Sequence, residues 1–124
     1  MPVWRAVGNV SQVELDAVQP ILSKDATAVV VDVREASAFK AGSLPQAINI
    51  PRSLVVDAKD MGEVRRAKDD GRLPMNDHNT RILVVGADAA SARYVAERLA
   101  REAFSNVGFL NETADQVRKV LAVR

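Results

Sequence analysis

The amino-acid sequence predicts an α/β fold, with a mostly parallel sheet of about four to five strands and helices on both faces. Four short runs rich in β-branched and apolar residues, at 28–33, 47–51, 81–86 and 106–110, have the length and character of strands. Segments with helical spacing stand between these runs. Because parallel strands require long crossover connections, this alternation favours parallel pairing with right-handed crossovers.

The chain is expected to open with an extended segment, residues 1–10, and to continue into a helix. Ser11 and Glu14 have the spacing of a capping box, in which two side chains satisfy each other's backbone N–H groups. A first helix is therefore predicted from Ser11 to about Leu22.

The run at 28–33 is nearly continuous in apolar residues, which is typical of a strand covered on both faces. A short helix is predicted after it, ending at Gly42, and Pro51 stops the second strand. A polar helix over 61–70 is expected to end at Gly71.

The third strand, 81–86, leads through a short loop into a well-defined amphipathic helix. Asp88 is a natural N-cap for a helix that begins near Ala89. Apolar residues then recur at helical spacing, so one face of this helix is expected to lie on the sheet: Ala92, Val95, Ala96, Leu99 and Ala103.

A final helix is predicted over 113–123, directly after the fourth strand. Thr113 and Gln116 have the spacing of a second capping box at its start.

The composition is that of one globular domain. With 48% hydrophobic and 27% charged residues, the 124 residues can bury a core, so 1–124 are predicted to form a single domain. Seventeen basic and sixteen acidic residues give a net charge of +1 without blocks of one sign, which argues against nucleic acid as a partner. No basic leader precedes an apolar stretch and no apolar run approaches the roughly 20 residues that cross a bilayer, so we expect no membrane partner and a cytoplasmic location.

The run from 29 to 51, VVVDVREASAFKAGSLPQAINIP, resembles the rhodanese-like family. That family has a strand, Asp-Val-Arg, a short helix, Gly-His-Ile-Pro-Gly-Ala and Ile-Asn-Ile-Pro in this order. The second half of the chain, from 81 to 110, is similar to the strand, active-site loop, helix and closing strand of the same family, so the resemblance spans 11–121. The matching residues of the first run are Asp32, Val33, Arg34, Glu35, Phe39, Gly42, Pro45, Ala47, Asn49, Ile50 and Pro51.

The resemblance implies a sulfurtransferase fold, but the residue that performs the chemistry is missing. Family sulfurtransferases hold a catalytic cysteine directly after the third strand, and that place falls on Gly86 here. The chain contains no cysteine, so no thiolate can carry a persulfide. The loop arginine and serine of the family align with Ser91 and Ala92. Persulfide transfer by the family mechanism is therefore excluded.

Other family positions are also replaced. Ser43 and Gln46 stand where the family has the histidine and the second glycine of Gly-His-Ile-Pro-Gly-Ala. The family has a pair of glycines after the last strand, and this chain has Asn-Glu-Thr-Ala, 111–114, in their place.

The loop after the third strand remains a candidate anion site, because backbone amides at a helix N-terminus bind anions without a cysteine. For Asp88 we favour an N-cap over an anion pocket, and both over a nucleophile, which would need an acid or a metal nearby. For Ser91 a capping or solvated role is favoured over a nucleophilic one. The candidate ligand-binding residues are Gly86, Ala87, Asp88, Ala89, Ala90, Ser91 and Ala92.

Asp32 and Arg34 lie two residues apart at a strand end, near the edge where α/β proteins bind ligands. The resemblance implies that they brace the active-site loop, and we favour this ion pair over direct ligand contact by Arg34. His78, the only histidine, is more typical of an exposed turn than of a catalytic or metal site. The charged helix that contains Glu63 and Arg66 is interpreted as a solvated face, with a docking surface as the alternative.

Two functions follow. The first is a non-catalytic rhodanese-like module that binds a protein partner or has a regulatory role. The second is a protein that binds a small anion or phosphorylated metabolite at the 86–92 loop, with weak hydrolytic activity as an extension. Neither requires a cofactor or a metal, and the sequence leaves the oligomeric state open.

Overall fold

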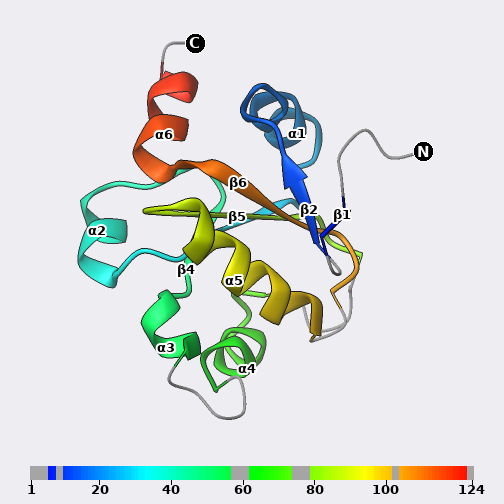
Figure 1. The fold of residues 1–124 in the computed structure, drawn as a ribbon, viewed down its shortest axis with the longest axis vertical. Coiled ribbons are helices and arrows are strands. Elements are labelled where there is room, and N and C mark those ends of the chain that lie inside the picture. Colours follow the sequence, from blue (N-terminus) through cyan, green and yellow to red (C-terminus); the bar gives the residue numbers. More distant parts are fainter. Residues whose placement is uncertain (1–5, 8–9, 57–61, 74–78, 102–103, 123–124) are drawn as a thin grey trace.

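The computed structural model describes residues 6–7, 10–56, 62–73, 79–101 and 104–122, which form a six-stranded sheet with helices around it (Figure 1). The order across the sheet is β1-β2-β6-β5-β3-β4. β1 runs antiparallel to β2, and every other neighbouring pair is parallel, so the predicted mostly parallel α/β sheet is confirmed. The strands are β1 (Ala6–Val7), β2 (Val10–Val13), β3 (Val29–Asp32), β4 (Ala47–Asn49), β5 (Ile82–Gly86) and β6 (Val107–Thr113).

The described residues also form a short 3-10 turn, η1, and six α-helices. α2 ends at Gly42 as predicted, and Gly71, which follows α4, has a φ of 85° that suits glycine. α3 is absent from the prediction, which interpreted Pro51 only as the end of a strand. None of the described helices is long and apolar enough to cross a membrane. The elements are η1 (Leu15–Ala17), α1 (Val18–Lys24), α2 (Ala36–Ala41), α3 (Arg52–Val56), α4 (Gly62–Asp69), α5 (Ala89–Arg101) and α6 (Ala114–Ala122).

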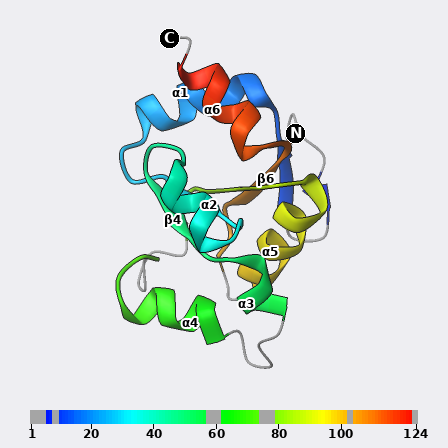
Figure 2. The ribbon, with the colours of Figure 1, turned by 90° about the vertical axis from the view of Figure 1, so that its left-hand side faces the viewer.

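Helices cover both faces of the sheet, as the sequence predicts. On β3, Val31 contributes to a core with residues of α4 and α5, whereas its neighbour Val30 contributes to a second core with residues of α1 and α6. Successive side chains of a strand point to opposite faces, so these are the two sides of one sheet. Figure 2 shows α1 and α6 on one side of the sheet and α3, α4 and α5 on the other.

The starts of α5 and α6 are capped as predicted. The Asp88 carboxylate accepts a hydrogen bond from the Ser91 backbone N–H at 2.7 Å. The Gln116 side chain accepts from the Thr113 N–H at 2.8 Å, and the Gln116 N–H donates to the Thr113 hydroxyl at 3.2 Å. The predicted buried face of α5 is also confirmed at Ala92, Val95, Ala96 and Leu99, and Ala103 lies outside the described residues.

The first predicted helix is wrong at its start. Ser11 lies in β2, where it pairs with Gly108 of β6, and Glu14 is extended and makes no side-chain cap. The helix α1 begins only at Val18. Val10 and Val13 are buried in β2, and the long-range pairing with β6 outweighs the local capping pattern. The fourth strand also continues beyond its predicted end to Thr113.

Gln46 occupies a left-handed backbone position with a φ of 62°, the only non-glycine residue with a positive φ among those described. This conformation strains any residue with a Cβ. The Gln46 side-chain amide donates hydrogen bonds to the carbonyl oxygens of Ala28 at 2.7 Å and Asp25 at 3.3 Å. Its own carbonyl accepts from the Val30 N–H. The side-chain bonds therefore offset a strain that glycine would avoid.

Substitution of Gln46 tests this balance. Gln46→Ala keeps the strain and loses both side-chain hydrogen bonds, so it should lower the free energy of unfolding by about 1–2 kcal/mol. Gln46→Gly loses the same bonds but relieves the strain, so its cost should be about 1 kcal/mol smaller. Urea unfolding of the three proteins measures both values, and equal values for the two variants would contradict the strain.

Candidate functional site

The connection between β5 and α5 is only two residues long, Ala87 and Asp88, and both are exposed at the carboxyl edge of the sheet. The hydrogen bonds that Asp88 accepts from Ser91 hold the pKa of its carboxyl below the ordinary value, and the positive charge of Arg52 lowers it further. Asp88 is thus ionised and already bound to one amide of the loop. The N-cap that the sequence favours is confirmed.

Gly86 is buried at the end of β5 and has no room for a side chain. A Cβ at this position would lie 2.6 Å from the Cγ2 methyl group of Val33. Valine has few alternative rotamers, so Val33 would have to shift to admit any larger residue. The position that the resemblance assigns to the catalytic cysteine therefore accommodates glycine, and a larger residue fits only if Val33 moves.

A hollow of about 360 Å³ lies beside this loop. It brings together the end of β3, α2, α3 and the start of α5, and charges of both signs stand on its wall. The Arg52 guanidinium lies 5.4 Å from the centre of the Tyr94 ring, and the Ser53 hydroxyl donates to the Glu35 carboxylate at 2.9 Å. The lining residues are Val33, Arg34, Glu35, Ala38, Arg52, Ser53, Ala87 and Ser91.

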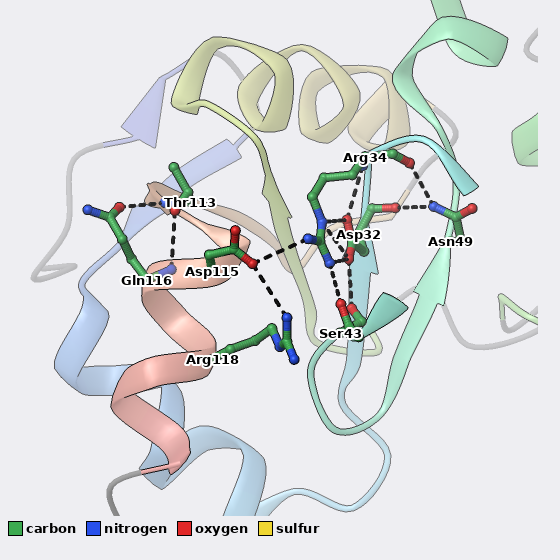
Figure 3. Close-up of polar contacts among 9 residues, drawn as sticks. Asp32, Arg34, Ser43, Asn49, Thr113, Asp115, Gln116 and Arg118 are labelled. Atoms are coloured by element: carbon green, nitrogen blue, oxygen red, sulfur yellow. Dashed lines mark hydrogen bonds and ion pairs between the residues drawn. The ribbon is translucent and has the colours of Figure 1, made fainter. Parts of the chain in front are cut away.

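Asp32 and Arg34 form a buried ion pair next to the hollow (Figure 3). Asp32 is fully buried, and its carboxylate accepts hydrogen bonds from Arg34 Nη2 at 2.7 Å and Nε at 3.0 Å. It also accepts from the Arg34 backbone N–H at 3.0 Å and the Ser43 hydroxyl at 2.7 Å. Burial alone would raise the pKa of Asp32, but these hydrogen bonds outweigh it and the pKa lies below the ordinary value.

The ion pair joins three segments. Arg34 Nη2 also donates to the Gly42 carbonyl at 2.7 Å, and Nη1 lies 3.5 Å from the Asp115 carboxylate at the start of α6. Asn49 of β4 donates to the carbonyl oxygens of Asp32 and Arg34, both at 2.9 Å. Figure 3 shows these groups meeting between β3, the Ser43 turn and α6. Arg34 lines the same hollow as the loop residues Ala87 and Ser91.

The structure therefore gathers some of the predicted site residues and adds others. Arg34, Ala87 and Ser91 line one hollow, whereas Ala92 is buried in the core. Four residues of the wall were not predicted from the sequence: Glu35, Ala38, Arg52 and Ser53. Arg52 and Ser53 belong to the unpredicted α3, and the only available signal was their place just after a strand end.

Two other expectations have different outcomes. His78 lies outside the described residues. The interpretation of the charged helix as a solvated face is wrong for Glu63, which is 8% exposed and forms ion pairs with Arg66 at 2.7 Å and Arg72 at 3.0 Å. Arg72 also donates to the Asn49 carbonyl, so this network fastens α4 to β4. Within the described ranges, no three histidine, aspartate or glutamate side chains gather closely enough to hold a metal ion.

Replacement of Asp32 should show the energetic weight of the ion pair. Asp32→Asn leaves the Arg34 guanidinium, 10% exposed, without its carboxylate, so the free energy of unfolding at pH 7 should fall by about 3 kcal/mol or more. Because the pKa of Asp32 is lowered below 3.8 in the folded state, its contribution is fully present above that value.

The contribution is lost as the pH falls through the lower pKa of the folded state. The difference between wild type and Asp32→Asn in urea unfolding should therefore be constant from pH 7 to about pH 5 and shrink below pH 3.8. Exposed Asp16 gives the control, because Asp16→Asn should leave the midpoint nearly unchanged. A difference that grows as the pH falls would contradict this assignment.

Comparison with solved structures agrees with the arrangement of the sheet. The rhodanese-like domain of a protein from Anabaena sp. is similar with a TM-score of 0.67 at 18% identity, covering 88% of this chain and 74% of that chain. An uncharacterized protein from Saccharomyces cerevisiae is similar with a TM-score of 0.67 at 22% identity, covering 84% of this chain and 87% of that chain.

A third similar structure is a variant of EanB in which ergothioneine is covalently linked with a persulfide cysteine, with a TM-score of 0.64 at 15% identity. The likeness covers 82% of this chain and spans only 24% of the EanB chain. At these identities the structures establish the fold alone. No curated protein matches the sequence significantly.

The sequence itself matches a protein family over residues 15–118, which is most of its 124 residues. That family is described as the rhodanese-like domain, the same description as that of the Anabaena structure. This chain therefore belongs to the rhodanese-like domain family, as a member without a cysteine.

Proposed function

We propose that this chain is a non-catalytic rhodanese-like module that binds a protein partner at the hollow beside the 86–92 loop. The observation that carries the first half of the proposal is the absence of cysteine from a chain with this fold. A persulfide forms only on a thiolate sulfur, and no other side chain can replace that atom.

A side chain of the loop already binds one of the loop's backbone amides. The Asp88 carboxylate takes the Ser91 amide at 2.7 Å, where a bound anion would otherwise accept a hydrogen bond. Its negative charge would repel an anion at the same place. Both features favour a role for the loop in a protein-binding surface over a role in binding an anion.

The hollow suits a side chain of a partner protein. Val33, Ala38 and Ala87 give it an apolar part, while Glu35 and Arg52 place opposite charges on its wall. An apolar recess with a few polar groups at its edge is the usual form of an anchor pocket in a protein interface. In this proposal, the Asp32–Arg34 ion pair keeps the wall of the hollow rigid.

The second candidate is a small-anion or phosphorylated-metabolite site in the same hollow. The Arg52 guanidinium favours it, because it lies on the wall of the hollow and can donate to an oxyanion. A thermal-shift panel of sulfate, thiosulfate, phosphate and sugar phosphates at fixed ionic strength separates the two candidates.

A ligand at 100 times its dissociation constant adds about 2.7 kcal/mol to the free energy of unfolding. If the hollow binds a protein partner, none of these anions should shift the unfolding temperature. A selective shift that Arg52→Gln abolishes would favour the second candidate instead.

Photo-crosslinking tests the partner site. A benzophenone amino acid in place of exposed Glu35 should form a discrete crosslinked product in cells. Ala38→Arg fills the hollow and should abolish that product, whereas Ser37→Arg, an exposed neighbour on α2, should leave it unchanged. A product that survives Ala38→Arg would place the contact elsewhere, and absence of any product would contradict the proposal.

Reintroducing a thiol tests the loop itself. Gly86→Cys alone should yield little or no thiocyanate from thiosulfate and cyanide, because Asp88 would raise the pKa of the thiol and the loop lacks an arginine. Overpacking against Val33 should also lower the free energy of unfolding by about 1–3 kcal/mol.

The double variant Gly86→Cys with Val33→Ala isolates the steric part. Gly86→Cys should lower the free energy of unfolding less in the Val33→Ala background than in the wild type. Thiocyanate formation by the double variant should stay near background. Robust turnover by Gly86→Cys would show that the loop is competent after all, and thiocyanate formation by the wild type would overturn the non-catalytic assignment.

A further inference from the structure

A second hollow, of about 230 Å³, lies at the opposite end of the sheet from the loop after β5. It is formed where β5 and β6 begin, together with β2, and polar groups make up much of its lining. It is smaller than the roughly 300–1,000 Å³ of sites for drug-sized ligands, so only a small molecule fits. Its lining residues are Ser11, Val13, Arg81, Ile82, Leu83, Ser105, Asn106, Val107 and Gly108.

A glycine contributes to this space. Gly108 precedes Phe109 and Leu110 on β6 and pairs with Ser11 of β2. A Cβ on Gly108 would collide with the Cγ2 methyl group of Val13, so the two strands approach each other closely here. Leu110, two residues along and on the same face, fills the core that lies under α1 and α6. The hollow is therefore a gap in the packing of that face at its amino-terminal end.

Arg81 is the one charged residue in the lining. It precedes β5 and shares a face with Leu83, so its side chain lies on the α1 side of the sheet. Arg81 is partly buried, yet no described residue accepts a hydrogen bond from its guanidinium or forms an ion pair with it. Arg81 also lines a neighbouring hollow with Lys24 and Asp25, and its positive charge helps to lower the pKa of the Asp25 carboxyl. The Asp25 carboxylate accepts its hydrogen bond from the Thr27 backbone N–H, at 3.0 Å.

The other polar side chains of the lining are neutral, and they belong to Ser11, Ser105 and Asn106. The Ser11 hydroxyl has no partner among the described residues. Asn106 Nδ2 donates to the Asn79 carbonyl at 3.3 Å, and the Ser105 hydroxyl donates to the Asn79 side chain at 2.7 Å. The lining thus presents one positive charge and no carboxylate. A partly buried guanidinium of this kind favours an anionic hydrogen-bond acceptor.

We propose that this hollow binds a small carboxylate, with the Arg81 guanidinium as its charge partner and the Ser11 hydroxyl as an additional donor. A carboxylate carries one negative charge, which matches the single cation, and its two coplanar oxygens match the fork of a guanidinium. A doubly charged phosphate would leave one charge without a partner. This site is independent of the hollow beside the 86–92 loop.

Titration of the ¹⁵N-labelled wild-type protein with acetate, at ionic strength held constant with chloride, tests the site directly. Saturable shifts are expected for the amides of Ser11, Asn106 and Gly108 and for the Arg81 Nε–H. Sulfate and inorganic phosphate should bind more weakly than acetate. Absence of saturable shifts, tighter binding of phosphate or sulfate, or shifts centred on 87–91 would each overturn the proposal.

A matched pair of variants assigns the charge. Arg81→Gln should weaken acetate binding by about tenfold or more, the usual weight of a charge-assisted hydrogen bond. Arg65→Gln removes the same charge from an exposed position on α4 and should bind acetate like the wild type. Their amide spectra report the fold of both variants. Equal affinities for Arg81→Gln and wild type would also overturn the proposal.

Discussion

The buried carboxylate of Asp32 organises the carboxyl edge of the sheet. A charge removed from water is stable in a protein only when donors replace its hydration, and here the Arg34 side chain, the Arg34 N–H and the Ser43 hydroxyl all converge on it. Each donor comes from a segment that must hold its position for the carboxylate to be satisfied. The end of β3, the turn after α2 and, through Asp115, the start of α6 are therefore placed relative to one another by one side chain.

This chain lacks the cysteine of its family, and residues at other replaced positions make contacts within the fold. Ser43 and Gln46 stand where the resemblance has a histidine and a glycine, and each makes a specific internal contact: Ser43 with Asp32, and Gln46 with the carbonyl oxygens beside β3. Gly86 packs against Val33, and Asp88 caps α5. The residues at these positions are therefore part of the hydrogen-bonded and packed structure of the fold.

Local signals predicted the elements better than they predicted the site. The same capping pattern is right at Thr113 and Gln116 but wrong at Ser11 and Glu14, because the buried Val10 and Val13 pair with a strand almost 100 residues away. Four strands and the caps of α5 and α6 follow from periodicity and N-cap chemistry. β2, α3 and the hollow depend on contacts between distant segments, and a single sequence carries little information about these. Asp32 and Arg34 were recognisable as a pair, whereas the partner of Arg34 on α6, Asp115, was not.

The two carboxylates that hold Arg34 lie in different media. Asp32 is inaccessible to solvent, but the Asp115 side chain is 71% exposed and divides its interaction between Arg34 and Arg118. Dissolved ions screen exposed charges over a Debye length of about 8 Å at physiological ionic strength and leave a dry pair nearly untouched. Added salt should therefore weaken the Arg34–Asp115 ion pair, which links β3 to α6, much more than the buried Arg34–Asp32 pair. The position of α6 relative to β3 thus depends on ionic strength, whereas the contacts around Asp32 do not.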